Sequence, residues 1–263
     1  MKITKELLKE KGVCAAGYRD FLKEYPVDKY PDGVEYQELL DCCAEKNFSY
    51  GSWLLGAFGK TDEVRKIGGD LIAEKGIIFA GQLEAEGCIK AGWGIEAGGD
   101  IEAGYGIEAG HGIKAGNGIN AGRGIKAGYS INAGDGIKAV WDIEASCKIK
   151  AGYGIKAGYG IKAGGDIEAG GDIEAGWGIK AGCSIKTSWG IKAGDGIEAG
   201  YNIKAGCGIE AGDGIEVGDE FGIYAGLCCR VTNKTLRKII AKERPENIMC
   251  GEFEEKSDSE GKA

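Results

Sequence analysis

Proline, histidine and long apolar runs are scarce in this chain, and each scarcity excludes a class of protein. The sequence holds 3 prolines and 1 histidine among 263 residues. A collagen helix needs glycine at every third position together with abundant proline, so the 50 glycines belong to another structure. No apolar run reaches the roughly 18 residues of a membrane span, and the first residues lack the apolar core of a signal peptide. We therefore expect no membrane partner.

The 10 cysteines are scattered and lack the spacing of a metal site or a redox pair. None forms a Cys-x-x-Cys pair, and no histidine lies at zinc-site spacing from them. We expect free thiols in a reducing, cytoplasmic environment, with no bound metal or other cofactor. The formal net charge is −8, and no segment is basic enough to form a nucleic-acid footprint. Nucleic acid is therefore not an expected partner.

What the chain has instead is a strict six-residue repeat. From residue 83 to residue 217 it reads Ile-Lys/Glu-Ala-Gly-x-Gly/Asp, and hexads of the same phase run from 77 to 220. In an extended segment the first and third places face one side and the second place faces the other. We therefore expect isoleucine and alanine inside, the charged second place outside, and bends at the glycines of the fourth and sixth places. The fifth place accepts many residue types, which predicts an exposed corner.

Three such hexads close one coil, so the repeat predicts a mainly β fold. The expected architecture is a three-sided, single-stranded β-helix, a solenoid with about 18 residues per coil. About 24 hexads give about eight coils and a stack of roughly 38 Å. Both ends of such a stack are open sheet edges, which natural solenoids cover with terminal caps.

The segments that flank the repeat are interpreted as these caps. Local patterns predict four helices near the start, at residues 4–11, 15–25, 36–46 and 49–58. Near the end they predict a helix at 233–242 and a strand at 248–253. We divide the chain into a helical N-terminal capping module (1–76), the hexapeptide-repeat β-helix (77–226), and a C-terminal cap with a frayed tail (227–263). A solenoid that is capped at both ends is expected to stay discrete.

Two resemblances follow from short stretches of the sequence. The run Gly-Asp-Ile-Glu-Ala-Gly-Tyr at 99–105, like the doubled run at 165–176, resembles the repeats of bactofilin-type polymer-forming proteins. That resemblance covers only the repeats and implies a right-handed three-sided β-helix that self-assembles. The opening Lys-Ile-Thr-Lys-Glu-Leu-Leu-Lys-Glu-Lys-Gly-Val-Cys at 2–14 is similar to the start of uncharacterised phage and bacterial repeat proteins, some of them thought to be immunity-like.

No catalytic set is apparent, and the chain is predicted not to be an enzyme. The hexapeptide acyltransferases, the other six-residue family, place a small residue two places before the aliphatic one, where this chain has Trp93 and Tyr105. The single histidine, His111, has Trp93 and Tyr129 as its neighbours one coil away, and neither is a carboxylate that could orient a general base. The aspartates at the sixth place, such as Asp100 and Asp142, recur at turns and are explained by turn chemistry.

Stacking every 18 residues aligns the fifth places into columns along the corners. One column combines aromatic, arginine and acidic side chains, and we predict that it binds a partner: Tyr105, Arg123, Trp141, Tyr159, Trp177, Asp195 and Asp213. Exposed aromatic residues and arginine are enriched at binding hot spots, and a contiguous stripe of them typically marks a partner surface. The alternative is a stacking ladder that only stabilises the coils. In the third column of fifth places, Tyr153 and Trp189 flank Gly171.

These observations together predict a non-enzymatic, protein-binding scaffold. The last coils are acidic and would attract a basic partner, so an inhibitor or immunity (anti-defence) protein acting on a toxin or nuclease is the most concrete version. The alternative is a bactofilin-like structural protein that self-assembles, and a homo-oligomer is therefore left open.

Overall fold

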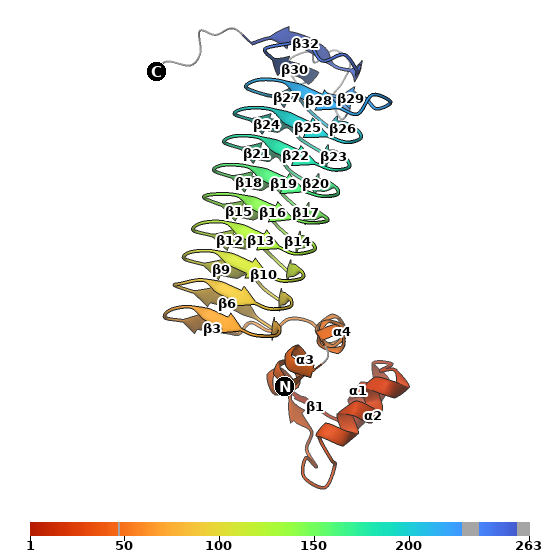
Figure 1. The fold of residues 1–263 in the computed structure, drawn as a ribbon. Helices are drawn as coiled ribbons and strands as arrows, with labels where there is room; N and C mark the ends of the chain where they lie inside the picture. The colour runs from red at the N-terminus through yellow and green to blue at the C-terminus, as the bar shows by residue number, and fades with distance from the viewer. Residues whose placement is uncertain (47, 228–236, 257–263) are drawn as a thin grey trace.

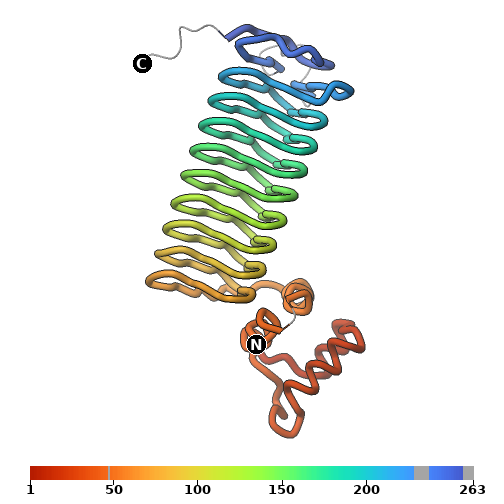
Figure 2. The backbone as a smooth tube through the Cα atoms, in the orientation of Figure 1, coloured from red at the N-terminus to blue at the C-terminus, as the bar shows by residue number. Residues whose placement is uncertain are grey.

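The computed structural model describes residues 1–46, 48–227 and 237–256 of the chain. Its main body is a β-helix in which the chain winds through three parallel sheets, and a group of helices lies at the N-terminal end (Figure 1). The tube in Figure 2 shows the coils stacked evenly along one axis. The predicted mainly β, three-sided solenoid is confirmed, whereas the right-handed sense implied by the resemblance stays a prediction.

Each sheet takes every third strand of the chain. Sheet A has 11 strands: β3 (Val64–Ile67), β6 (Gln82–Ala85), β9 (Ile101–Ala103), β12 (Ile119–Ala121), β15 (Ile137–Ala139), β18 (Ile155–Ala157), β21 (Ile173–Ala175), β24 (Ile191–Ala193), β27 (Ile209–Glu210), β30 (Lys238–Ala241) and β32 (Glu252–Glu255). Sheet B has 9 strands: β4 (Leu71–Ala73), β7 (Ile89–Ala91), β10 (Ile107–Ala109), β13 (Ile125–Ala127), β16 (Ile143–Ala145), β19 (Ile161–Ala163), β22 (Ile179–Ala181), β25 (Ile197–Ala199) and β28 (Ile215–Val217). Sheet C has 10 strands: β5 (Ile77–Phe79), β8 (Ile95–Ala97), β11 (Ile113–Ala115), β14 (Ile131–Ala133), β17 (Ile149–Ala151), β20 (Ile167–Ala169), β23 (Ile185–Thr187), β26 (Ile203–Ala205), β29 (Ile223–Tyr224) and β31 (Ile248–Cys250).

The register follows the hexad without a slip through the central coils. Ile107 pairs with Ile125, and Ala109 pairs with Ala127, so the same place of the hexad recurs 18 residues on. Isoleucines of the first place are almost fully buried, as at Ile107 and Ile125, each 1% exposed. Alanines of the third place complete the same core, whereas most second places face solvent. Burial of an isoleucine side chain contributes about 1.5–3 kcal/mol, so this one repeated residue supplies most of the apolar stabilisation.

The helical module contains four helices in the described residues. They are α1 (Lys5–Glu10), α2 (Ala15–Glu24), α3 (Tyr36–Lys46) and α4 (Phe48–Phe58). The side chain of Thr4 accepts a hydrogen bond from the backbone N–H of Leu7, which confirms Thr4 as the N-cap of α1. A short antiparallel pair, β1 (Lys2–Ile3) with β2 (Val34–Glu35), was not predicted, because two-residue strands carry no periodic signal.

The module packs partly on the outer face of sheet C. Ile78 occupies an outward second place, yet it is only 1% exposed because the helices cover it. One coil further on, Glu96 is 3% exposed and accepts hydrogen bonds from Ser52 of α4 and from Lys114. The side-chain amide of Gln37 on α3 donates to the carbonyl of Ile78 and accepts from the N–H of Ala80, as a neighbouring strand would. The module therefore completes the terminal strand of sheet C.

The β-helix begins earlier than the predicted boundary at residue 77. Strands β3 and β4 precede that residue and pair in parallel with β6 and β7, so they belong to the solenoid and not to the helical module. Their hexads start with Arg65 and Leu71 and lack the Ala-Gly signature, which hid them in the sequence. Together with the strands added near the C-terminus, they extend the stack beyond the predicted eight coils, to sheets of 9, 10 and 11 strands.

The C-terminal segment continues the solenoid in its described part. Residues 233–236 of the predicted helix 233–242 lie outside the described residues, and the prediction is wrong for 238–241, which form β30. Pairing of Ile209 with Ile239 explains the difference, because an apolar residue that continues the isoleucine row outweighs local helix propensity. The predicted strand at 248–253 is present as β31 and β32.

Candidate functional site

The predicted binding residues form one continuous column along the edge where sheet A passes into sheet B. The backbone N–H of Arg123 donates to the carbonyl of Tyr105 at 2.9 Å, and that of Trp141 donates to Arg123 at 3.2 Å. The same bond links each later member, through Tyr159, Trp177 and Asp195 to Asp213. We call these seven residues the corner column. Stacking of the coils therefore brings together every residue that was predicted to share the site.

Arginine and aromatic side chains of the corner column contact one another and remain accessible. The Arg123 guanidinium carbon lies 4.5 Å from the ring centre of Tyr105 and 5.2 Å from that of Trp141. Tyr159 and Trp177 meet edge to face with their ring centres 5.1 Å apart. Trp177 is still 59% exposed. Both predicted roles are therefore compatible with this geometry, because the rings stack on each other and also present faces to solvent.

The acidic end of the corner column is partly neutralised. The Lys242 amino group lies 2.8 Å from the Asp213 carboxylate. Asp195 makes no ion pair that is recorded among the described residues, and its side chain faces solvent. The negative charge that is free to attract a partner is therefore centred nearer Asp195 than Asp213.

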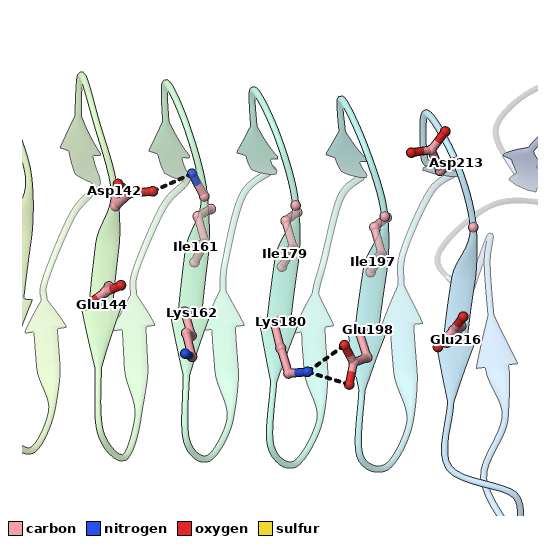
Figure 3. A pocket seen from close by; sticks show the side chains of 14 residues that line it. Asp142, Glu144, Ile161, Lys162, Ile179, Lys180, Ile197, Glu198, Asp213 and Glu216 are labelled. Carbon is pink, nitrogen blue, oxygen red and sulfur yellow. Dashed lines mark hydrogen bonds and ion pairs between the residues drawn. The ribbon is translucent and has the colours of Figure 1, made fainter.

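An open trough runs beside this end of the corner column (Figure 3). Its floor follows the glycines of the sixth place, such as Gly178 and Gly196, where no side chain fills the surface. Its far wall is a row of second-place side chains in which Lys180 binds Glu198 at 2.7 Å, as Figure 3 shows. The wall is therefore mixed in charge, and the trough is open along its length.

The aspartates of the sixth place act as backbone acceptors. Asp142 accepts a hydrogen bond from the N–H of Gly160 at 2.8 Å, and Asp172 accepts one from Gly190 at 2.7 Å. Each carboxylate thus ties one turn to the turn of the next coil. This matches the structural role that turn chemistry assigned to them.

The only histidine of the chain lies in another column, on the edge where sheet B passes into sheet C. The ring of His111 stacks on Tyr129 with ring centres 5.0 Å apart and an interplanar angle of 14°. On its other side Trp93 lies 5.9 Å away. The His111 ring thus has aromatic neighbours on both sides, as the sequence predicted.

A third column contains a gap between two exposed aromatic residues. Tyr153 and Trp189 lie one coil below and one coil above Gly171, on the edge where sheet C passes into sheet A. Tyr153 is 66% exposed and Trp189 is 61% exposed. Both line an open pocket together with Asp172 and Gly171.

The helical module contains a cleft that the sequence did not predict. Phe21 of α2 and Tyr25, the C-cap of that helix, line it together with Cys43 of α3 and Trp53 of α4. Burial raises the pKa of the Cys43 thiol to about 12, so this thiol stays protonated near neutral pH. An aromatic pattern at helical spacing marks both a core and a cleft, so the sequence alone could not distinguish them.

Comparison of the chain with protein-family models, with curated proteins and with solved structures finds no match. Within the described part of the chain, no three histidine, cysteine, aspartate or glutamate side chains converge as a metal site would require. None of the helices described is both long and apolar enough to cross a membrane.

Proposed function

We propose that this chain is a non-enzymatic scaffold that binds another protein through the corner column. The observation that carries the proposal is the contiguous, exposed stack of aromatic and arginine side chains at Tyr105, Arg123, Trp141, Tyr159 and Trp177. These residue types dominate binding energy at protein interfaces, and rings with few rotatable bonds lose little entropy on binding. A rigid β-helix holds them in one geometry before the partner arrives.

The partner that fits this surface is basic. Asp195 and Glu216 lie at the acidic end, and no ion pair is recorded for either in the described part of the chain. Fixed negative charge of this kind speeds encounter with a positively charged protein. Inhibition of a basic toxin or nuclease in the cytoplasm, as an immunity-like or anti-defence protein, is the concrete form of the proposal.

The test is retention of a partner by a variant that lacks the aromatic rings of the corner column. Tyr105, Trp141, Tyr159 and Trp177 are replaced together by alanine, and tagged wild-type and variant proteins are used to capture proteins from the source cell. Mass spectrometry should identify a basic protein on the wild type that is reduced at least roughly tenfold on the variant, since each ring is worth about 1 kcal/mol or more.

The matched control replaces Trp93, Tyr129 and Tyr201 on the neighbouring column by alanine. This variant loses three exposed rings, against four in the corner-column variant, and should retain the partner. Equal capture by the corner-column variant and the wild type would refute the proposed surface.

A second candidate function, bactofilin-like self-assembly, is favoured by the two ends of sheet A. The first strand, β3, carries Arg65 and Lys66, and the last strand, β32, carries Glu254 and Glu255. If β32 of one copy paired with β3 of the next in the register of the solenoid, Lys66 would face Glu254. Lysine and glutamate already face each other in this way within the chain, as at Lys66 and Glu84, 3.0 Å apart. Open edges of complementary charge are a route to filaments.

Sedimentation velocity of the purified protein separates the two candidates. Self-assembly predicts oligomers whose size rises with concentration and falls with salt, because the ends are charged. Glu254→Lys should abolish the oligomers, and adding Lys66→Glu to the same chain should restore them. A monomer at every concentration rules out the second candidate and leaves the first intact.

A further inference from the structure

In the corner column, the fold holds a planar cation between two aromatic rings. The Arg123 guanidinium lies between two rings, with Tyr105 one coil below and Trp141 one coil above. Two coils are separated by roughly 9.6 Å, which leaves room for one planar group between two aromatic faces. The chain's own arginine thus occupies the space between the two rings and makes cation–π contacts on both sides.

The same flanking residues recur at another corner, but with nothing between them. Tyr153 lies one coil below Gly171 and Trp189 one coil above, the same order as Tyr105, Arg123 and Trp141. Because glycine has no side chain, Gly171 places nothing between the two aromatic residues. Tyr153 is 66% exposed and Trp189 is 61% exposed, against 47% for Tyr105 and 45% for Trp141. We call Tyr153, Gly171 and Trp189 the slot.

The backbone differs at the upper side of the slot. Elsewhere in these columns the fifth-place N–H donates directly to the fifth-place carbonyl one coil below, as Gly171 does to Tyr153 at 3.1 Å. The N–H of Trp189 instead donates to the hydroxyl of Thr187 at 3.2 Å, and that hydroxyl donates to the carbonyl of Gly171. Thr187 stands where other hexads have alanine, and its side chain is buried. A hydroxyl therefore bridges the two coils where a direct bond is normal.

The surroundings of the slot favour a positive charge. The pocket that contains it is lined by the carboxylates of Asp100, Asp135, Asp172 and Glu174 and by the amino groups of Lys138 and Lys156. Lys156 is held by Glu174 at 2.7 Å. Asp172, which directly follows Gly171, uses one oxygen to accept from Gly190 and keeps acceptor capacity on the other. Of these carboxylates, Asp172 lies beside the gap, whereas Asp100 lies four coils below it and is bound to Gly118.

We propose that the slot is a binding site for the guanidinium group of an arginine side chain presented by another protein. The guanidinium would stack between Tyr153 and Trp189, as Arg123 does between its neighbours, and would donate hydrogen bonds to the Asp172 carboxylate. Arginine fits better than lysine because its planar head stacks on both rings and forms paired hydrogen bonds, whereas an ammonium group is a compact and strongly hydrated charge. The slot lies on a different edge from the corner column and does not depend on the function proposed for that column.

Two reciprocal substitutions test the proposal. Gly171→Arg supplies an internal guanidinium and should close the slot, since its backbone has no positive φ to prevent a side chain. An ideal Cβ there would lie 3.2 Å from the nitrogen of Gly154, so Gly171→Ala is included to show the effect of a methyl group alone. Arg123→Gly removes the internal arginine and should open a second slot between Tyr105 and Trp141.

The probes are an arginine-containing peptide, its lysine counterpart and free arginine, each titrated while the indole N–H signals are followed by NMR. In the wild type the arginine peptide should shift the Trp189 signal, and the lysine peptide should bind roughly fivefold more weakly or worse. Gly171→Arg should abolish the shift while Gly171→Ala keeps it, and Arg123→Gly should add a shift at Trp141. Free arginine shifting Trp189 as strongly as the peptide would identify a small-molecule site instead of a protein docking site.

No shift at Trp189 with any guanidinium probe, or an equal shift with the lysine peptide, would overturn the proposal. Partner capture through the corner column is measured separately, so a negative result in the NMR titration does not decide the capture experiment, and the reverse is also true.

Discussion

At the scale of single residues, the distance between stacked coils restricts the choice of residue most strongly at the fourth place of the hexad. An ideal Cβ on Gly152 would lie 1.9 Å from the carbonyl oxygen of Gly134 in the coil below. Glycine is required there by close backbone approach and not by φ, which is not positive at this residue. Val140, a larger residue at the same place, shows the alternative, since its N–H donates to Ala121 at a longer 3.3 Å. The fourth place thus tolerates a side chain only when the coils separate locally.

Gly152→Ala should therefore lower the free energy of unfolding by about 1–3 kcal/mol. The control is Gly136→Ala at a sixth place, where the nearest atom to the new Cβ is the oxygen of Gly154 at 3.4 Å, an ordinary contact. Urea unfolding followed by circular dichroism measures both variants. Equal stability of the two would show that the backbone relaxes freely at the fourth place.

At the scale of elements, α3 replaces a missing strand with a side chain. The Gln37 side-chain amide donates to the carbonyl of Ile78 in β5 and accepts from the N–H of Ala80, which directly follows β5, and it also donates to Asp41. Buried backbone groups rarely remain unpaired, so Gln37 adds to the contacts of Ser52 and Ile78 that couple the helical module to sheet C.

Gln37→Ala should destabilise the junction by about 1–3 kcal/mol, because it leaves a donor and an acceptor of β5 without partners. Hydrogen exchange at the Ala80 amide should accelerate accordingly. Gln82→Ala, which removes a side chain that donates to Glu84 and not to Ile78 or Ala80, is the control and should leave exchange at Ala80 unchanged. Unaltered exchange in Gln37→Ala would mean that the module holds the strand by other contacts.

Sheet C also carries an ion-pair group with a defined pH dependence. A hydrogen bond from Lys148, 2.9 Å away, lowers the pKa of Glu168, with a further contribution from Lys150. A carboxyl group whose pKa is lower in the folded state stabilises the fold above its unfolded pKa of about 4.3 and loses that contribution as the pH falls through its folded pKa.

Glu168→Gln should therefore be less stable than the wild type at pH 7, by at most about 1 kcal/mol because its pair with Lys148 is partly exposed, and equal to it in strong acid. Thermal melts across pH 2–7 test this expectation. Glu144→Gln, whose partner Lys126 is 3.8 Å away, should show a smaller difference. A Glu168→Gln difference that persists unchanged at pH 2 would contradict an electrostatic origin.

The sequence predicted elements well where the hexad repeats and poorly where it does not. The isoleucine phase located the strands from β5 to β28, and local capping located α1 to α4 within one or two residues. Strands β3 and β30 were missed because Arg65 and Ile239 stand in hexads without Ala-Gly, where only pairing with a neighbouring coil defines the strand. The corner column followed from the period alone, whereas the Thr187 bridge at the slot is particular to one hexad, in which threonine replaces alanine, and the period does not predict its hydrogen bonds.

At the scale of the whole molecule, the local stability of a coil depends on its position along the axis of the β-helix. Each central coil is held by the coil above and the coil below, whereas terminal strands have a neighbour on one side only. Isoleucines such as Ile149 are fully buried, but Ile67 and Phe253 near the ends are only partly buried. Solenoids of this kind are stabilised by interfaces between adjacent repeats, so they open from the ends.

Amide exchange of the whole chain should therefore be slowest in the middle coils and faster toward both ends. Strands β15 to β19 should show the highest protection, and β31 and β32 the lowest within the solenoid, with mass spectrometry of peptide fragments as the measurement. Uniform protection along the axis would indicate that the chain unfolds as one cooperative unit.

The three-hexad coil also sets how insertions and deletions would rearrange the surface. Loss of 18 residues, one full coil, shortens the rod but leaves every downstream side chain on its original edge. Loss of a single hexad preserves the isoleucine interior equally well, yet it rotates everything downstream by a third of a turn. Tyr153 would then fall in line with His111 and Tyr129. New juxtapositions of surface groups are thus reachable in one genetic step that leaves the interior intact.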